Sequence, residues 1–273
     1  MKPAEVDGAA HGRMGGGRGD ARPPTLPPRD EDRDVPLHGV IALDGPSGTG
    51  KSTVAQALAM RLGLRYLDTG ATYRAVTLAV LQAGLDPEDG EAVGRLAETV
   101  TVEVSTDPYN LWVVLDGRRV DGLIRSAPVT TAVSPVSALP RVRRRLVAEQ
   151  QKLIGEGDIV VEGRDIGTVV APAAPLKIFL TASQDARAHR RARQDGPAGA
   201  DDVAATASAL QRRDSYDSAR QLSPLRPAED AVHVDTTQLS IDEVVRQLVD
   251  MARSRGIGKV RAAARYAADG QDR

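Results

Sequence analysis

The sequence contains no cysteine, and its aromatic residues amount to 3% of the chain, with one tryptophan and one phenylalanine. The absence of cysteine excludes disulfide bonds, thiolate metal ligands and cysteine nucleophiles. With so few rings, the core is expected to consist of Ala, Val, Leu and Ile. A surface that stacks the bases of a nucleic acid is disfavoured for the same reason.

Long apolar runs are also missing. No segment approaches the roughly 18 residues that a membrane span needs, and the N-terminus lacks the apolar centre of a signal peptide. The formal net charge is −1, which argues against bulk electrostatic binding of nucleic acid. We therefore expect a cytoplasmic protein that has neither a membrane nor a nucleic acid as a partner. Oligomeric state is not readable from the sequence, and a monomer is the default expectation.

Lysine is scarce, with 5 lysines against 31 arginines, yet one of the five completes a motif. The apolar run Val40–Leu43 leads into Gly45-Pro-Ser-Gly-Thr-Gly-Lys-Ser52, the spacing of a phosphate-binding loop, and a helical pattern follows it. Glycines allow backbone N–H groups to turn toward an anion, and a helix start adds donors and positive charge. The motif predicts a nucleoside triphosphate site rather than a plain glycine-rich turn.

Within this loop, Lys51 is expected to meet the β- and γ-phosphates of ATP, and the Ser52 hydroxyl to ligate Mg²⁺. The residues expected to bind the donor nucleotide are Gly45, Pro46, Ser47, Gly48, Thr49, Gly50, Lys51, Ser52 and Thr53.

The 273 residues divide by composition into a central domain and two polar tails. Residues 1–34 are largely Gly, Pro, Arg and Asp, so they are expected to form a disordered tail with no catalytic part. A basic docking arm is the alternative, but acidic residues offset its arginines. Residues 35–253 are expected to form the catalytic domain, and residues 254–273 a polar C-terminal tail.

The central domain alternates short apolar runs with helical patterns, which indicates an α/β fold with a doubly wound parallel sheet. The expected strands are Val40–Leu43, Arg65–Leu67, Ile159–Val161, Lys177–Leu180 and Val232–Val234. The expected helices follow the phosphate loop and cover Tyr73–Leu81, Leu139–Ile154 and Ile241–Met251, the last with a capping box of Ser240 and Glu243.

One stretch breaks this alternation. Thr99–Val104, Leu111–Leu115 and Arg118–Val120 read as three strands, and Asp116-Gly117 between the last two predicts a type I′ hairpin. An antiparallel patch inside a parallel α/β chain indicates an inserted subdomain, at about residues 96–136.

Two further polar clusters follow expected strands. Asp68-Thr69-Gly-Ala-Thr-Tyr73-Arg74 lies one helix beyond the phosphate loop, at the crevice of a doubly wound sheet. Arg74 could grip a phosphate there while Thr69 and Tyr73 shape the pocket. Alternatively, Asp68 and Thr69 only cap a helix and Arg74 faces solvent.

The second of these clusters is Glu162-Gly163-Arg164-Asp165, where adjacent opposite charges could contact a polar substrate. Alternatively, Asp165 caps a helix and Arg164 forms an exposed ion pair. Glu162 stands where a carboxylate could hold a Mg²⁺-bound water.

Two arginine-rich helical segments come later in the chain. Ala186–Arg193 is the first, and Arg213, Asp217 and Arg220 share one helical face in the second if that helix persists. Phosphoryl transfer requires positioning and neutralisation of charge, which a lid of arginines at about residues 187–202 would supply. A solvated charged face is the alternative for either helix.

In this order, the motifs resemble the bacterial cytidylate kinase family of nucleoside monophosphate kinases. The resemblance runs from about Val40 to Ala252. It depends on the segments Asp44–Thr53, Leu67–Arg74, Val161–Val170, Lys177–Ala182 and Arg213–Asp217. It implies a P-loop fold with a five-stranded parallel sheet, and ATP-dependent, Mg²⁺-dependent phosphorylation of CMP and dCMP to the diphosphates.

The resemblance also implies roles for single residues. Arg74, Arg164, Arg213 and Arg220 would contact the CMP phosphate, Asp217 the sugar hydroxyls, and Arg190 would lie near ATP. Ser134, Arg143 and Asp165 would read the cytosine edge, which needs an acceptor for its amino group and donors for N3 and O2. Lys51, Arg164 and Arg213 are the expected catalytic residues.

The segment between Arg193 and Val203 is rich in Gly, Ala and Asp, and Tyr216 stands where some relatives have an arginine. Both differences weaken the expectation of full lid contacts. Two other functions stay open. One is a kinase of the same fold for UMP or shikimate, and the other is a P-loop NTPase switch, although neither a base-specificity motif nor a water-positioning residue for a switch is visible.

Overall fold

The computed structural model describes residues 38–155, 157–194 and 203–258. Residues 1–34, residues 195–202 of the expected lid and residues 259–273 of the expected C-terminal tail lie outside the described residues. The division into a catalytic domain, an insertion and a lid therefore stays a prediction. Among the residues that are described, no helix is long and apolar enough to cross a membrane.

The centre of the fold is a parallel sheet of five strands in the order β2-β6-β1-β7-β8. The strands are β1 (His38–Asp44), β2 (Arg65–Asp68), β6 (Gly157–Glu162), β7 (Leu176–Thr181) and β8 (Val232–Asp235). Each contains one of the sequence-predicted strands, and all pairs are parallel, so the predicted fold class is confirmed. Leu43 and Asp68 both pair with Glu162, which places the carboxyl ends of three strands at one edge.

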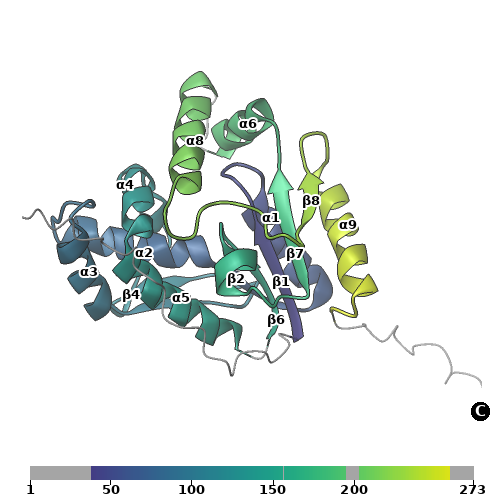
Figure 1. Cartoon of the computed structure of the whole chain (residues 1–273), viewed down its shortest axis with the longest axis horizontal. Helices are drawn as coiled ribbons and strands as arrows, with labels where there is room; N and C mark the ends of the chain where they lie inside the picture. Colours follow the sequence, from purple (N-terminus) through teal and green to yellow (C-terminus); the bar gives the residue numbers. More distant parts are fainter. Residues whose placement is uncertain (1–37, 156, 195–202, 259–273) are drawn as a thin grey trace, which may run out of the picture. The chain divides into compact units, whose positions relative to one another are not determined.

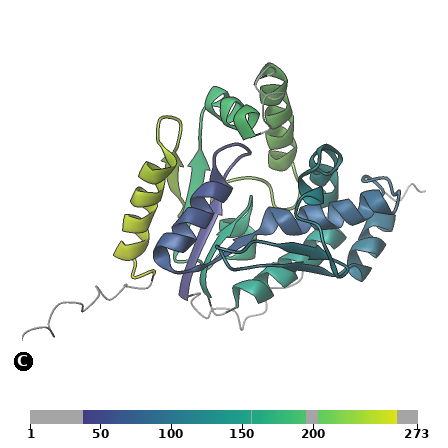
Figure 2. The ribbon, with the colours of Figure 1, turned by 180° about the vertical axis from the view of Figure 1, so that it is seen from behind.

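Helices cover both faces of this sheet. On one face, α1 (Lys51–Leu62) and α9 (Ile241–Ser254) pack on apolar strand residues such as Ile41 and Ile178, and Figure 2 shows α1 in front of the strands. On the other face, α5 (Pro140–Ile154) and the short π-helix η3 (Ile166–Val170) are joined to the sheet by the apolar cluster around Ile154 and Ile166. The predicted capping box at the start of α9 is confirmed, with both reciprocal hydrogen bonds between Ser240 and Glu243 present.

A second, antiparallel sheet consists of β3 (Val102–Val104), β4 (Val113–Leu115) and β5 (Arg118–Arg119). Asp116 and Gly117 have φ values of 48° and 76°, so both turn residues have the positive φ that the predicted type I′ hairpin needs. The first strand is shorter than predicted, because Thr99 ends a helix and the strand begins only at Val102.

Four further helices pack beside the small sheet or lead to it. They are α2 (Thr69–Gln82), α3 (Gly90–Thr99), α4 (Ala127–Ala138) and the short 3₁₀ helix η2 (Leu123–Arg125). The sequence patterns had predicted neither α3 nor α4. Helix α4 contains Pro135 and buries one helical face, which consists of Val129, Ala132, Val133 and Val136. The three valines of that face pack in the same apolar cluster as residues of α2 and α3.

The small sheet region also covers one edge of the large sheet. Strand β2 is an edge strand, and its Tyr66 amide donates to the Thr106 carbonyl at 2.9 Å. Close by, the Gln56 side chain of α1 donates to the Pro108 carbonyl at 2.7 Å. The segment between β3 and β4 therefore lies along the open side of β2.

Two polar helices, α6 (Gln184–Gln194) and α8 (Val203–Ser218), pack against each other and stand above the carboxyl ends of the strands (Figure 1). Their positions bring the arginine-rich segments of the sequence to the edge that carries the phosphate loop. The second helix ends earlier than the pattern suggested, since Arg220 lies two residues beyond Ser218.

Candidate active site

The phosphate loop joins β1 to α1, as the motif predicts. Gly45 and Gly50 have φ values of 147° and 88°, a backbone region that strongly favours glycine. At Gly45 space is limiting as well, because an added Cβ would lie 2.2 Å from the Leu180 carbonyl oxygen of β7. Thr49 Oγ1 closes the loop by donating to the Pro46 carbonyl at 3.0 Å.

Lys51 begins α1 and is buried, with 6% of its surface exposed. Its Nζ donates to the Pro46 carbonyl at 2.6 Å. Burial holds the pKa of Lys51 well below its usual range, and the neighbouring Arg164 acts in the same direction. A buried ammonium among other cations is stabilised by an anion, so this position suits a phosphate group.

Oxygen-bearing side chains gather beside the loop at the ends of β2 and β6. Tyr66 donates to the buried Glu162 carboxylate at 2.5 Å, and Ser52 is also a hydrogen-bond partner of that carboxylate. Burial, together with the charge of Asp68, raises the pKa of Glu162 to about 7. A hydroxyl and carboxylates beside a phosphate site are the hard oxygen donors that Mg²⁺ takes, so this donor set fits that ion.

Arg74, Arg164, Arg213 and Arg220 come close together although they lie far apart in the chain, and Arg164 and Arg213 also lie near Lys51. Burial and then the charge of Arg164 lower the pKa of Arg213 to about 9. Its Nε is buried and, among the described residues, makes no hydrogen bond. Arg74 is anchored by donating to Thr130 Oγ1 at 2.9 Å and to the Ile124 carbonyl at 3.1 Å. The cluster holds more positive charge than its carboxylate partners neutralise, an arrangement that is suited to a second anion.

Asp217 is the main carboxylate partner in this cluster. It is almost fully buried, with 1% of its surface exposed. It accepts from Arg164 Nε at 3.2 Å and from Arg220 Nη2. The predicted grouping of Arg213, Asp217 and Arg220 is thus brought together, although Arg220 reaches Asp217 from beyond the helix end rather than along its face. Arg164 forms an ion pair with Asp217, but its side chain is mostly buried, so the alternative of an exposed ion pair is wrong.

Arg143 and Asp165 form a buried ion pair behind these arginines. Burial opposes the charge of Arg143, but Asp165 outweighs it, and the pKa of Arg143 rises above its usual value. The guanidinium lies 5.3 Å from the centre of the Tyr73 ring. The side chain of Asp165 makes no capping hydrogen bond to η3, so the alternative role as a helix cap is wrong.

Ser134 lies on α4 and is partly buried, and within the described residues no side-chain hydrogen bond of its own is found. Ser137, one turn later, carries the contacts instead. Its carbonyl accepts from Arg143 Nη1 at 3.1 Å and its hydroxyl from Arg220 Nη2 at 2.8 Å. Sequence reasoning missed Ser137, since a serine near the end of an unpredicted helix gives no local signal.

Asp68 and Thr69 lie at the start of α2, and the alternative reading of a helix cap is confirmed for Asp68, whereas the role of Thr69 in a substrate pocket stays a prediction. Asp68 caps the helix by accepting from the Ala71 amide at 3.1 Å. Thr69 donates to the Glu162 carbonyl at 2.7 Å, so it ties the start of α2 to the end of β6.

Arg190 of α6 is held near the phosphate loop by Thr236, the residue that follows β8. It donates to Thr236 Oγ1 at 2.9 Å and to the Thr236 carbonyl at 2.5 Å. The Thr236 hydroxyl in turn donates to the Thr49 carbonyl of the loop at 3.3 Å. Thr236 follows β8 and was not predicted, because the threonine contacts the loop only through the fold.

Asp44 is a third residue to which the sequence analysis gave no role of its own. It ends β1 directly before the loop and accepts from the Ile166 amide at 2.9 Å and the Gly167 amide at 2.8 Å. Burial raises its pKa to about 6, although both backbone hydrogen bonds act against that rise. One buried carboxylate thus connects the phosphate loop to the segment that carries Arg164 and Asp165.

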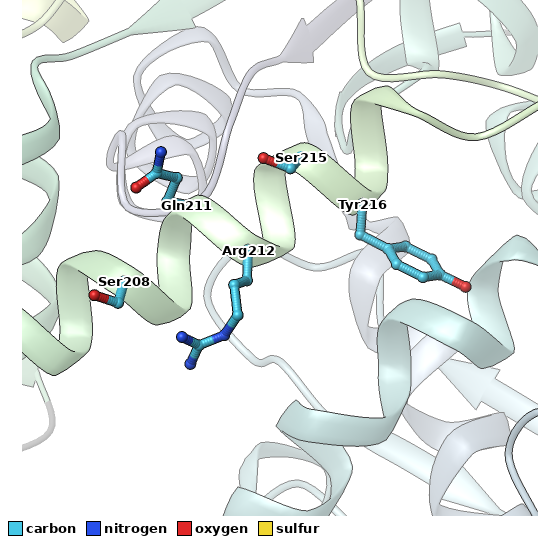
Figure 3. A pocket seen from close by; sticks show the side chains of 5 residues that line it. All are labelled: Ser208, Gln211, Arg212, Ser215 and Tyr216. Atoms are coloured by element: carbon cyan, nitrogen blue, oxygen red, sulfur yellow. The ribbon is translucent and has the colours of Figure 1, made fainter.

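Tyr216 does not point into this cluster. It is 44% exposed and lines a shallow hollow along α8 with Arg212 and the small polar side chains on the same helix (Figure 3). The replacement of an arginine by tyrosine at this position therefore falls on a solvent-facing part of α8.

The comparisons with known proteins agree with this geometry. A family model described as cytidylate kinase matches residues 41–254. The cytidylate kinase of Mycolicibacterium paratuberculosis (strain ATCC BAA-968 / K-10) is 55% identical over 218 residues, covering 79% of this chain and 96% of that protein. That of Nocardia farcinica (strain IFM 10152) is 54% identical over 79% of this chain and 93% of its own length. That of Rhodococcus opacus (strain B4) is 53% identical over 81% and 97%.

Proposed function

The chain belongs to the cytidylate kinase family and catalyses ATP-dependent phosphorylation of CMP and dCMP, and from this premise we propose how its own residues carry out the transfer. The donor triphosphate lies on the loop Gly45–Thr53, and the acceptor phosphate lies among the arginines opposite. The observation that supports this arrangement is the convergence of Arg74, Arg164, Arg213 and Arg220 in the neighbourhood of Lys51.

In the reaction, an oxygen of the CMP phosphate attacks the γ-phosphorus of ATP in line. The new oxygen–phosphorus bond forms as the bond between the γ-phosphorus and the β-γ bridging oxygen breaks, giving CDP and ADP. No general base is required, because a phosphate monoester with a second pKa of about 6 is already ionised at neutral pH. The protein contributes positioning and charge, which are the main needs of phosphoryl transfer.

Lys51, Arg164 and Arg213 would stabilise the charge on the group in transit. Lys51 is buried beside Arg164 and Arg213, and all three cations are partly desolvated, so each interacts more strongly with a phosphoryl group than it would in water. Arg190, anchored on Thr236, would lie over the donor side.

We infer that Ser52 would hold Mg²⁺, with Glu162 close enough to orient a water on the ion. Such an ion supplies charge neutralisation for the β- and γ-phosphates when it is bound. The hydrogen bond from Tyr66 would keep Glu162 in one orientation.

The cytosine ring would lie near Tyr73, between Ser134 and the pair of Arg143 and Asp165. The carboxylate can accept from the cytosine amino group, and a guanidinium can donate to N3 and O2. Uracil has a carbonyl in place of that amino group, so it would face Asp165 with an acceptor against an acceptor. Asp217 and Thr69 would meet the sugar.

The test is calorimetric titration with CMP, dCMP and UMP, followed by an assay of ADP release with each acceptor. We expect binding of CMP and dCMP, weak binding of UMP, and ADP release only with an acceptor present. Acceptor-independent hydrolysis would favour an NTPase switch. A preference for UMP or for a non-nucleotide acceptor would favour another kinase of this fold.

We also propose a cytoplasmic location, because ATP and nucleoside monophosphates are supplied there. A monomer is proposed because the proposed site is assembled from residues of a single chain, and light scattering of the purified protein tests it.

A further inference from the structure

Ser47, the third residue of the phosphate loop, has all three of its polar groups bonded to other segments. Its hydroxyl accepts from Arg164 Nη2 at 2.8 Å. Its amide donates to Asp214 Oδ1 at 3.0 Å, and its carbonyl accepts from Arg187 Nη1 at 3.2 Å. The residue is buried, with 6% of its surface exposed. These three hydrogen bonds hold Ser47 in place and connect the phosphate loop to the segments that carry its partners.

The partners of Ser47 come from the three elements that surround the crevice. Arg164 follows β6, Arg187 belongs to α6 and Asp214 to α8, and Arg187 and Asp214 also form an ion pair with each other. Asp214 directly follows Arg213 in the chain, so its bond to the loop holds the turn of α8 that carries Arg213 near the loop.

The contact with Arg164 has the clearest consequence. The guanidinium of Arg164 is held at three points, by Ser47 Oγ, by Asp217 and by its own Gly163 carbonyl. Of the three, only the serine hydroxyl comes from the donor side of the crevice.

We propose that Ser47 is a positioning residue that couples the two substrate sites, because its hydroxyl orients Arg164 toward the acceptor phosphate while its backbone ties α6 and α8 to the donor loop. This inference rests on the proposed assignment of Arg164 to the acceptor phosphate. A nucleotide that orders the loop also orders Arg164, so donor and acceptor strengthen each other's binding, by equal factors.

The experiment is calorimetric titration of CMP into the full chain, with and without a saturating non-hydrolysable ATP analogue. In the wild type, the analogue tightens CMP binding. In Ser47→Ala, CMP binds about tenfold more weakly, as expected for loss of a hydrogen bond to a charged group, and the tightening by the analogue disappears. Affinity for the analogue alone falls by a smaller factor than affinity for CMP, because the lost hydroxyl bonds Arg164 while the backbone of the loop is kept. Ser47→Thr, which restores a hydroxyl, recovers most of the CMP affinity.

The matched control is Ser208→Ala on the exposed side of α8 (Figure 3). Within the part of the chain that the structure describes, the Ser208 hydroxyl bonds only the Ala204 carbonyl of its own helix. It leaves both affinities unchanged. The proposal is overturned if Ser47→Ala binds CMP like the wild type. It is also overturned if that variant loses affinity for the analogue and for CMP to the same degree, since the serine would then only support the fold of the loop.

These failures differ from a failure of the proposed function itself. If Arg164→Ala keeps full CMP affinity, or if the wild type does not bind CMP, the assignment of the acceptor site is wrong whatever Ser47 does.

Discussion

Lys51 is the residue on which the donor site depends most. Its ammonium is buried beside Arg164, a position that is unfavourable for the free protein and favourable once phosphate is bound. Lys51→Ala removes that charge and also relieves repulsion, so the fold is expected to be as stable as the wild type or more so. The turnover number is expected to fall by about a hundredfold or more, because charge stabilisation of the transition state is lost.

This prediction is checked by steady-state ADP release together with urea unfolding of the same preparation. Near-normal turnover of Lys51→Ala would contradict the mechanism, whereas a lost urea transition would show that the lysine is needed for folding instead.

Asp44 makes a prediction about pH. Its pKa is raised from 3.8 to about 6 by burial, so the folded protein holds this proton more tightly than the unfolded chain does. The contribution of Asp44 to the free energy of unfolding therefore decreases as pH rises from about 4 to about 6, by about 3 kcal/mol in all.

The measurement is the difference in unfolding free energy between the wild type and Asp44→Asn, from urea titrations at pH 4 and pH 7. Other titrating groups cancel in this difference. We expect it to shift by about 3 kcal/mol in favour of the variant at the higher pH. A difference that is the same at both pH values would show that Asp44 ionises as freely in the folded state as in the unfolded one.

At the scale of single elements, the start of α9 offers a test of local stability. The Ser240 hydroxyl accepts a hydrogen bond from the Glu243 amide, and the Glu243 carboxylate accepts one from the Ser240 amide at 2.8 Å. Ser240→Ala is expected to cost about 1 kcal/mol of unfolding free energy without altering turnover.

Urea unfolding measures this loss, and Ser254→Ala at the other end of the same helix is the control. Among the described residues, the Ser254 hydroxyl bonds only the Met251 carbonyl of its own helix. Its removal is therefore expected to lower the free energy of unfolding by much less. Equal losses for the two variants would mean that the capping box contributes nothing specific.

The strands and the motif-bearing helices were predictable because their signals are local. The run Val40–Leu43 and the turn at Asp116-Gly117 each encode their structure within a few residues. Helix α4 was not predicted. Its buried residues Val129, Ala132, Val133 and Val136 do follow a helical spacing, but Pro135 and the β-branched residues around it disfavour a helix.

The parts of the site also differ in whether their sequence signal is local. The phosphate loop is contiguous in the chain and could be predicted from its motif. The bond between Ser47 and Asp214 joins residues 167 positions apart, and the bonds of Asp44 span 122 and 123 positions. No periodicity or spacing in one sequence records such pairs, so the contacts that tie the two halves of the site together appear only in the fold.

For the whole molecule, ligand binding and stability are linked. A ligand that binds only the folded state raises the free energy of unfolding by about 2.7 kcal/mol at a concentration of one hundred times its dissociation constant. CMP and an ATP analogue are each expected to raise the melting temperature of the wild type by several degrees. In Arg213→Ala, the shift with CMP is expected to be much smaller and the shift with the analogue to be retained.

Thermal melting with each nucleotide separately makes the measurement. Arg212→Ala is the matched control, because that neighbouring arginine is exposed on α8 (Figure 3) and has no place in the proposed site. Loss of both shifts in Arg213→Ala, or of the CMP shift in Arg212→Ala, would contradict the division into donor and acceptor residues.

The segment that lies along β2 has a consequence for the solution behaviour of the protein. An uncovered edge strand presents free N–H and C=O groups that can pair with a strand of another molecule and begin aggregation. Tyr66 of β2 instead donates to Thr106, so the loop between β3 and β4 occupies part of that edge. The small antiparallel region thus covers part of the edge of the central sheet, and a chain in which the loop between β3 and β4 is shortened is expected to aggregate more readily.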